Sequence, residues 1–175
     1  VAGILAGRIE TGGDLLMQTI QIIALGKCKE SYLREACKEY EKRLSRFCQL
    51  QVTELEPVPL PQNPSEKEIA AALEKEGAEL LKRAKGFCIA MCIEGKQLDS
   101  TGLAKKLEQA AQGGENGAVT FLIGSSYGLA DAVKQRANLR LSMSAMTFPH
   151  QLARVMLLEQ IYRSYQILSG TKYHK

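Results

Sequence analysis

Short apolar runs alternate with segments of helical periodicity along this chain, and this alternation limits the fold more than any other feature. Apolar runs rich in β-branched residues occur at 19–25, 87–93 and 118–123. Segment 31–44 and the segment from 149 to about 168 place apolar residues at helical spacing. Continuous apolar strands are expected where helices cover both faces of a parallel sheet. The sequence therefore predicts an α/β fold with a mostly parallel sheet and helices on both faces.

The remaining elements follow the same alternation. Further strands are expected at 50–55 and 139–143, and further helices from Ser65, at 101–112 and at 129–137. Ser65 and Glu68 have the spacing of a capping box, which marks the start of a helix. Segment 57–64 holds four of the five prolines and is predicted to be an extended loop within one domain. Residues 94–96 (EGK) are predicted to turn the chain.

Length and composition indicate a single globular domain. The chain has 175 residues, of which 45% are hydrophobic and 24% charged, as in ordinary soluble proteins. Residues 1–16 are glycine-rich and lack the pattern of a signal peptide, so we interpret them as an artificial, disordered leader before a domain at 17–175. No stretch has the length of a transmembrane helix, and we expect no membrane partner. Cysteines that are expected to be reduced and buried favour a cytoplasmic protein. The net charge of +4 permits an RNA or phosphate partner but does not require one.

The five cysteines favour buried, reduced thiols over a metal site. None of them forms a CxxC pair, and Cys88 and Cys92 lie in an apolar strand. The two histidines of the chain lie far downstream at spacings that do not suit zinc. We therefore expect no metal.

The segment 147–175 is predicted to be functional as well as a packing element. It holds both histidines, His150 and His174, on either side of a basic helix. Histidine titrates near neutral pH, and arginine and tyrosine beside an apolar helix face suit contacts with phosphates and bases. The tail 172–175, which includes Tyr173, is either a frayed terminus or a flexible arm carrying an aromatic ring and an imidazole.

Two pairs of charged or titratable residues lie on the terminal helix. Residues four apart share a helix face, so His150 and Arg154 lie together. Glu159 and Arg163 form a second pair, about half a turn away from the first. This second pair is either a surface ion pair of little energetic value or an acid that orients an arginine for substrate. The spacing is compatible with both.

Two loops are candidates for ligand binding. A glycine-bearing turn at 124–128 follows a buried strand and precedes a helix, an arrangement common in nucleotide sites. It contains neither GxGxxG nor a P-loop, so a ligand role and a plain tight turn are about equally supported. Segment 142–150 offers small and hydroxylic residues where parallel sheets bind ligands, although a simple connector fits equally well.

With these residues in hand, the chain closely resembles the RlmH family, which are small SPOUT-class methyltransferases of large-subunit ribosomal RNA. The resemblance covers 17–175 and rests on the motifs ALGK at 24–27, YxKRL at 40–44, EGK at 94–96, LIG…GL at 122–129, SxMTFPHQLxRVxLLEQIYR at 144–163 and the final YHK. One departure is visible: the family usually has a second glycine where this chain has Ser125, and serine restricts φ more than glycine does.

The resemblance implies a carboxyl-terminal trefoil knot, an obligate homodimer, and bound S-adenosylmethionine. It also implies methylation of N3 of a pseudouridine in 23S rRNA on the assembled ribosome. The cofactor contacts it implies are Met91, Cys92, Gly124, Met143, Ser144, Ala145, Met146, Thr147 and Phe148. The substrate-side residues it implies are His150, Arg154, Glu159, Arg163, Tyr173 and His174.

These implied residues suggest a mechanism. Arg154 and Arg163 would position phosphate or the developing anionic base. Tyr173 and His174 would close over the flipped nucleotide. His174, Glu159 or a water would take the N3 proton. The competing hypothesis is a non-enzymatic α/β module that binds RNA or nucleotides, in which the glycine turn is only structural.

Overall fold

A five-stranded parallel sheet forms the centre of the protein. The computed structural model describes residues 7–11 and 14–171. The strands are β3 (Thr19–Leu25), β4 (Gln49–Leu55), β5 (Phe87–Gln97), β6 (Val119–Ile123) and β7 (Leu139–Ser142), in the order β4-β3-β6-β5-β7. Every neighbouring pair in this sheet is parallel, which confirms the predicted parallel α/β fold.

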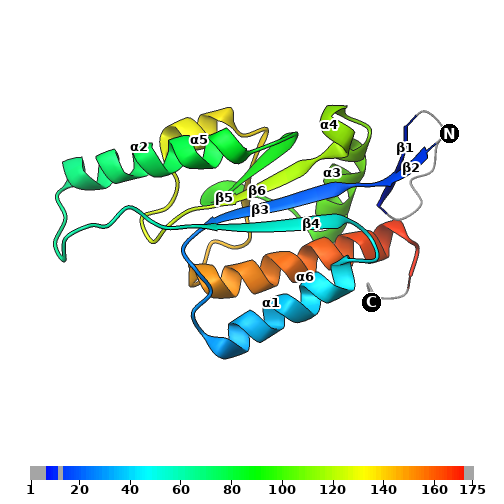
Figure 1. The fold of residues 1–175 in the computed structure, drawn as a ribbon, viewed down its shortest axis with the longest axis horizontal. Coiled ribbons are helices and arrows are strands. Elements are labelled where there is room, and N and C mark those ends of the chain that lie inside the picture. Colours follow the sequence, from blue (N-terminus) through cyan, green and yellow to red (C-terminus); the bar gives the residue numbers. More distant parts are fainter. Residues whose placement is uncertain (1–6, 12–13, 172–175) are drawn as a thin grey trace.

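Helices cover both faces of the sheet, as the continuous apolar strands predict. Helices α1 (Ser31–Leu44), α3 (Ser100–Ala111) and α6 (His150–Leu168) pack on one face, whereas α2 (Glu66–Arg83) and α5 (Asp131–Arg136) pack on the other (Figure 1). Each face has its own apolar cluster, so side chains that alternate along β3 enter different clusters. The short α4 (Gly114–Gly117) leads into β6.

Local signals mark the ends of the helices. Ser65 precedes α2, and its hydroxyl accepts a hydrogen bond from the Glu68 N–H while the Glu68 carboxylate accepts one from the Ser65 N–H, which confirms the capping box. Asp99 caps α3 by accepting a hydrogen bond from the Gly102 N–H at 2.6 Å. Pro149 directly precedes α6, and its fixed φ is compatible with the start of a helix.

A buried polar cluster joins α6 to α3 beneath the sheet. The Tyr165 hydroxyl on α6 donates to Gln18 Oε1 at 2.8 Å. Gln18 Nε2 donates in turn to the carbonyls of Leu107 and Gly117, at 3.0 and 2.8 Å. Burial without partners would cost each of these groups free energy, so the cluster fixes how the elements pack.

The predicted turn at 94–96 is a distortion within one strand. β5 continues through this segment, but its register with β7 shifts so that Met91 and Lys96 both pair with Leu141. The intervening residues leave the regular ladder, as in a bulge. A Cβ on Gly95 would lie 2.8 Å from the Arg140 carbonyl oxygen, so this close approach of two backbones requires glycine.

The expectation that 1–16 is disordered is wrong for the described part of that segment. β1 (Arg8–Thr11) and β2 (Asp14–Met17) form an antiparallel pair outside the main sheet (Figure 1). The Gln18 N–H donates to the Gly7 carbonyl at 2.7 Å, which connects the hairpin to the start of β3. A glycine-rich sequence is compatible with this hairpin, because glycine favours the tight turns that join paired strands.

Candidate functional site

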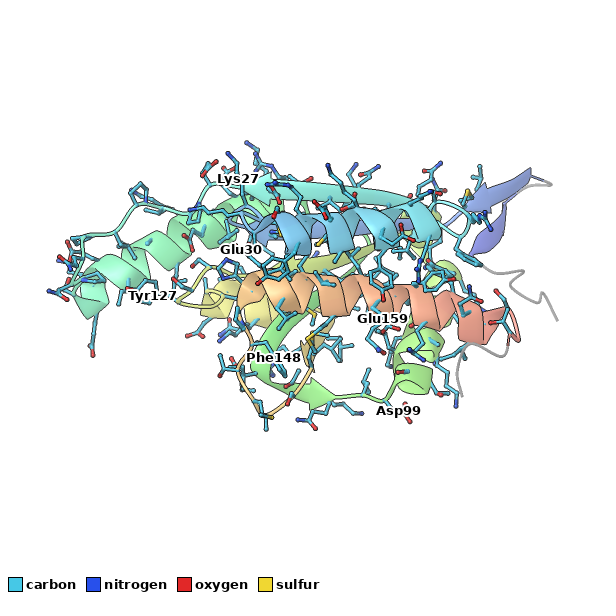
Figure 2. All side chains as sticks on the ribbon, turned by 90° about the horizontal axis from the view of Figure 1, so that it is seen from below. Lys27, Glu30, Asp99, Tyr127, Phe148 and Glu159 are labelled. Carbon is cyan, nitrogen blue, oxygen red and sulfur yellow. The ribbon has the colours of Figure 1, made fainter. Side chains whose placement is uncertain are left out.

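The carboxyl ends of the parallel strands enclose a cavity of about 770 Å³, which we call the loop cavity. Its walls come from the distorted part of β5, the turn after β6, the segment after β7, and the start of α6. This is the edge at which open parallel sheets bind ligands, because the connecting loops diverge there. Figure 2 shows Tyr127 and Phe148 near the amino-terminal end of α6.

The loop cavity brings together almost all of the predicted cofactor residues. Those that line it are Met91, Cys92, Gly124, Met143, Ser144, Met146, Thr147 and Phe148. Ala145 lies on the same segment with an exposed side chain and is not among the lining residues. His150, predicted on the substrate side, also lines the cavity.

The glycine turn is both a tight turn and a wall of the loop cavity, so the two interpretations of 124–128 are compatible. The Gly128 N–H donates to the Ser125 carbonyl at 2.9 Å, and Gly128 has a φ of 86°. A Cβ on Gly124 would lie 2.3 Å from the Gly128 carbonyl oxygen. Glycine is therefore needed at 128 for its backbone conformation and at 124 for close approach.

The segment after β7 is held by its own hydroxyl groups. Ser142 Oγ donates to the Ser144 carbonyl at 3.0 Å, and Ser144 Oγ accepts from the Met146 N–H at 3.0 Å. Such local side-chain bonds satisfy the backbone without helix or sheet. They give an irregular segment a defined shape along one wall of the cavity.

An ion pair near Cys92 contributes to the lining of the loop cavity. Lys134 and Glu94 both line the cavity and form a salt bridge with each other. The hydrogen bond from Lys134 lowers the pKa of Glu94, so this carboxylate is ionised at neutral pH. Burial, followed by the nearby Glu94 charge, raises the pKa of Cys92 above its usual value. Cys92 is therefore a neutral thiol near pH 7, which does not suit a covalent nucleophile.

Arg154, predicted on the substrate side, is not among the residues that line either cavity. Its side chain is only 3% exposed. It forms an ion pair with Glu54 on β4, and its Nη2 donates to the Gly26 carbonyl at 2.9 Å. Glu54 also accepts a hydrogen bond from the Cys28 N–H at 3.2 Å. These partners assign Arg154 to holding α6 against the ends of β3 and β4.

His150 lies beside the same loop, as its spacing from Arg154 predicts. A Cβ on Gly26 would lie 3.7 Å from His150 Nε2. Gln151 Oε1 accepts hydrogen bonds from the N–H groups of Lys29 and Glu30, at 2.8 and 3.2 Å. The start of α6 is thus fixed against the loop after β3, and this places the imidazole at the loop cavity.

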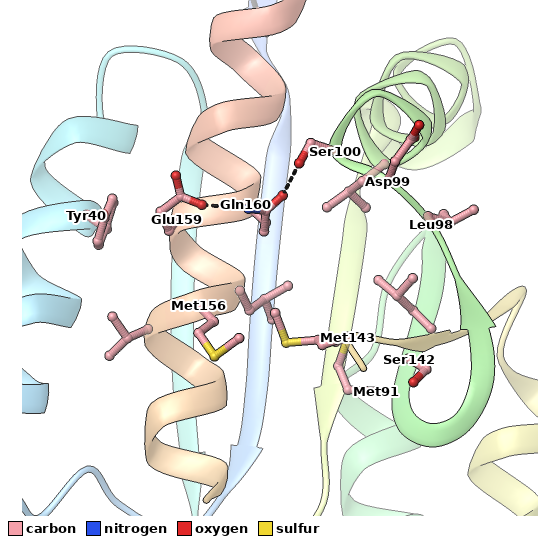
Figure 3. A pocket seen from close by; sticks show the side chains of 14 residues that line it. Tyr40, Met91, Leu98, Asp99, Ser100, Ser142, Met143, Met156, Glu159 and Gln160 are labelled. Carbon is pink, nitrogen blue, oxygen red and sulfur yellow. Dashed lines mark hydrogen bonds between the residues drawn. The ribbon is translucent and has the colours of Figure 1, made fainter. Parts of the chain in front are cut away.

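A second cavity of about 680 Å³, which we call the helix cavity, lies between α6, α3 and the edge of the sheet. It shares Met91, Leu141 and Met143 with the loop cavity, so the two are adjacent. Most of its lining is apolar. Figure 3 shows its polar side, where Ser100, Gln160 and Glu159 lie in a row.

Glu159 lines the helix cavity as part of a hydrogen-bonded chain. Arg163 Nη2 donates to Glu159 Oε1 at 2.7 Å, and Gln160 Nε2 donates to Glu159 Oε2 at 2.7 Å. Ser100 Oγ donates to Gln160 Oε1 at 2.6 Å. The predicted Glu159–Arg163 pair is therefore formed, with both side chains partly buried. The two predicted residues of the tail, Tyr173 and His174, lie outside the described residues.

Sequence reasoning missed several residues of the two cavities. Lys134 in the loop cavity carried no motif that distinguished it from surface residues. Tyr127 and Ile93 lie in the glycine turn and in an apolar strand that the sequence marked, but no pattern pointed to these two side chains. Tyr40 on α1 reaches the helix cavity from an element distant in sequence. For Glu94 there was a signal, because it belongs to the EGK motif, which predicts a turn and contributes to the family resemblance but was not assigned to the site.

Within the described parts of the chain, no group of three or more potential metal-ligating side chains is arranged to hold a metal ion. A search of the same residues finds no helix with the length and apolar character needed to cross a membrane.

Comparison with known proteins gives one consistent match. Residues 17–174 match the family model described as "Predicted SPOUT methyltransferase". The chain is 49% identical over 158 residues to a ribosomal RNA large subunit methyltransferase H of Clostridium beijerinckii and 47% identical to that of Clostridioides difficile. Each alignment covers 89% of this chain and 99% of the relative.

A solved structure supports the fold. A probable methylase family protein from Haemophilus influenzae superposes with a TM-score of 0.50 at 13% identity, over 90% of this chain and 70% of that one. At this identity the likeness concerns the fold alone.

Proposed function

Because this chain belongs to the SPOUT methyltransferase family and to its ribosomal RNA large subunit methyltransferase H group, we propose that it transfers a methyl group from S-adenosylmethionine to ribosomal RNA of the large subunit. The acceptor is N3 of a pseudouridine, and the substrate is the assembled ribosome. The observation that carries the proposal is the loop cavity, which gathers eight of the nine predicted cofactor residues: Met91, Cys92, Gly124, Met143, Ser144, Met146, Thr147 and Phe148.

The residues of the loop cavity fit S-adenosylmethionine. A volume of about 770 Å³ lies in the range of small-molecule sites. Met91, Met143 and Phe148 offer apolar surface for an adenine ring, and Ser144 and Thr147 offer hydroxyl groups for the ribose or the amino-acid end. S-adenosylmethionine supplies, when bound, an electrophilic methyl group on a sulfonium.

The side chains around the loop cavity determine which group could accept the N3 proton of an acceptor base. A bound cofactor and base would displace water from the loop cavity, which would strengthen electrostatic interactions inside the site. The N3 proton of the base must leave during the reaction. His150 lines the loop cavity, and Glu159 lies in the adjacent helix cavity with Arg163 and Gln160 holding its oxygens. His150 and Glu94 both line the proposed cofactor site, and Glu94 is already paired with Lys134. We therefore infer that His150 is the proton acceptor there, with Glu159, His174 and water as the other candidates.

The working form that we propose is a knotted homodimer in the cytoplasm. The family resemblance implies both the trefoil knot and the dimer. The apolar lining of the helix cavity, with Leu98, Val155 and Met156, supports a second copy as its cover. A net charge of +4 per chain is modest for binding free RNA. This charge favours a dimer that binds the shaped surface of a ribosome, because two copies double the basic area.

We also propose that 17–175 is one methyltransferase domain and that 1–16 is an added leader. The family match begins at residue 17, and the hairpin lies outside the main sheet. A variant lacking 1–16 should methylate ribosomes at a rate within about twofold of the full chain, a difference too small to indicate a lost site contact. A larger loss, measured with labelled cofactor, would place the hairpin in the functional domain.

Methyl transfer from labelled S-adenosylmethionine tests the proposed activity. The acceptors are intact ribosomes, ribosomes that already carry the modification, and naked 23S rRNA. We expect label on unmodified intact ribosomes alone, mapped to N3 of a pseudouridine. Label on naked RNA alone would identify free 23S rRNA, and not the assembled ribosome, as the substrate. Absence of both label and cofactor binding would favour the non-enzymatic binding module.

A Gly124→Ala variant tests where the cofactor binds. The added methyl group would lie 2.3 Å from the Gly128 carbonyl oxygen, so the turn must move into or away from the loop cavity. We expect at least a tenfold loss of cofactor affinity in calorimetric titration, roughly 1.4 kcal/mol. Unchanged affinity in a folded variant would place the cofactor elsewhere.

A further inference from the structure

A buried carboxyl group on the opposite face of the sheet contacts the glycine turn. Glu76 on α2 is 5% exposed. Its Oε2 accepts a hydrogen bond from the Ser125 hydroxyl at 3.0 Å, and its Oε1 accepts one from the Val58 N–H at 2.9 Å. Ser125 belongs to the turn that lines the loop cavity, whereas Val58 belongs to the proline-rich segment after β4. One side chain therefore connects two loops at the ligand-binding edge of the sheet.

Helix α2 provides a fixed base for this carboxyl group. A Cβ on the next residue, Gly77, would lie 3.0 Å from Val133 Cγ2 and 3.1 Å from Ala130 Cβ. The absence of a side chain at 77 thus lets α2 approach the start of α5 closely. Both contacts lie just after the glycine turn in the chain, so α2 and the turn are packed as one unit.

Ser125 is the point at which the turn is anchored. Its carbonyl accepts the Gly128 N–H at 2.9 Å, which closes the turn, and its hydroxyl holds the turn to α2. A glycine at this position would have no hydroxyl group to donate, so the contact with Glu76 depends on the serine side chain.

We propose that Glu76 and Ser125 are positioning residues for S-adenosylmethionine: Glu76, acting through the Ser125 hydroxyl, holds the glycine turn in the conformation that binds the cofactor. The inference rests on the proposed location of the cofactor in the loop cavity. A held turn is already in its binding conformation, so binding loses less conformational entropy. The contact lies behind the turn, so it affects cofactor affinity more than the chemical step.

The test compares Ser125→Ala with Ser125→Thr in the full chain. Alanine removes the hydroxyl, and we expect cofactor affinity measured by calorimetry to fall about tenfold, as for one lost hydrogen bond to a carboxyl group. With intact ribosomes, KM for the cofactor should rise by a similar factor while kcat stays within about twofold, because the effect is on binding. Threonine restores the hydroxyl and should recover most of the affinity. Ser45→Ala, an exposed hydroxyl deletion at the end of α1, is the matched control.

A double-mutant cycle tests whether Glu76 acts through Ser125. Glu76→Ala alone should weaken cofactor binding, but in the Ser125→Ala background it should add less than about twofold, because the two groups share one interaction. Glu79→Ala, one turn along the exposed side of α2, is the matched control. If Glu76→Ala does not fold, the Ser125→Ala and Ser125→Thr pair decides the proposal by itself.

The outcomes separate this inference from the proposed function. Wild-type affinity in Ser125→Ala, combined with loss of binding in Gly124→Ala, would overturn the positioning role and leave the cofactor site in place. Wild-type affinity in both variants would overturn the cofactor site itself. A fall in kcat with unchanged KM in Ser125→Ala would also contradict a role in cofactor positioning.

Discussion

At the scale of single residues, two carboxyl groups organise the edge of the sheet where the loop cavity lies. Glu54 accepts the Cys28 N–H and pairs with Arg154, while Glu76 accepts the Val58 N–H and the Ser125 hydroxyl. Each therefore satisfies a backbone donor in a loop and ties that loop to another element. Buried donors need such partners, so these carboxyl groups stabilise irregular segments that helices and strands do not hold.

Arg154→Met should destabilise the protein without removing a substrate contact. The substitution leaves Glu54 without its buried partner, and breaking a buried pair costs about 3–5 kcal/mol, less here because Glu54 is partly exposed. We expect a loss of about 2–3 kcal/mol in the free energy of unfolding measured with urea. Arg83→Met, at the more exposed Glu79–Arg83 pair on α2, is the comparison, with a loss below about 1 kcal/mol. Equal stability of the two variants would contradict the structural role of Arg154.

Cys92 should report occupancy of the loop cavity. It lines the cavity and is partly exposed, whereas the other four cysteines are buried. Its raised pKa predicts slow alkylation by iodoacetamide at pH 7 and faster alkylation as pH rises toward that pKa. Burial is the larger cause of the raised pKa of Cys92, and Glu94→Gln removes the second cause, the nearby negative charge, so the rate at fixed pH should increase. Peptide mass spectrometry measures the rate at Cys92.

Bound S-adenosylmethionine should protect Cys92 from this alkylation, and the Glu94→Gln variant should be protected to the same extent. An equal rate with and without saturating cofactor would contradict the proposed location of the site. Glu79→Gln, an exposed carboxylate on α2, should leave the rate unchanged and serves as the control.

At the scale of elements, α6 joins the parts of the site. Its first residue, His150, lines the loop cavity; Arg154 holds the ends of two strands; Glu159 lines the helix cavity. Toward its end, Tyr165 connects to α3 through Gln18. Because one helix carries all four, a shift of α6 would change both cavities together.

Tyr165→Phe tests this connection. The variant keeps the ring but leaves Gln18 Oε1 without the hydroxyl that donates to it in the interior. We expect a loss of about 1–3 kcal/mol in unfolding free energy, the cost of an unsatisfied buried acceptor. Tyr32→Phe, at an exposed tyrosine on α1, is the matched control and should be neutral. Thermal and urea unfolding followed by circular dichroism would measure the stability of both variants. If Tyr165→Phe is as stable as the wild type, the hydrogen bonds of Gln18 do not stabilise the packing of α6.

At the scale of the whole molecule, the helix cavity connects the proposed activity to the proposed dimer. It shares a wall with the loop cavity, so a second copy that covers it would also limit access to the cofactor site. A charged residue placed there should oppose association, because burying an unpaired charge is costly.

Met156→Glu should therefore convert a dimer into a monomer and reduce methyl transfer with it. Light scattering after size-exclusion chromatography gives the oligomeric state. Leu16→Glu adds a charge at an exposed residue of the amino-terminal hairpin and should leave the dimer unchanged. A Met156→Glu variant that remains dimeric would exclude the helix cavity from the interface.

The sequence by itself determined the elements, the covered parallel sheet, and the segments that form the loop cavity. These features follow from local patterns: the periodic spacing of apolar residues, the continuous apolar strands, and the glycine and proline residues at turns. Only the tertiary structure decided the direction of Arg154, the distortion of β5, and the anchoring of Ser125 by Glu76. The partners of Arg154 and Ser125 lie 100 and 49 residues away in the chain, and the packing of whole elements against each other brings them together. No local pattern records such a contact, so the directions of Arg154 and Ser125 could not be predicted. The Glu159–Arg163 pair could be, because its partners lie four residues apart on one helix.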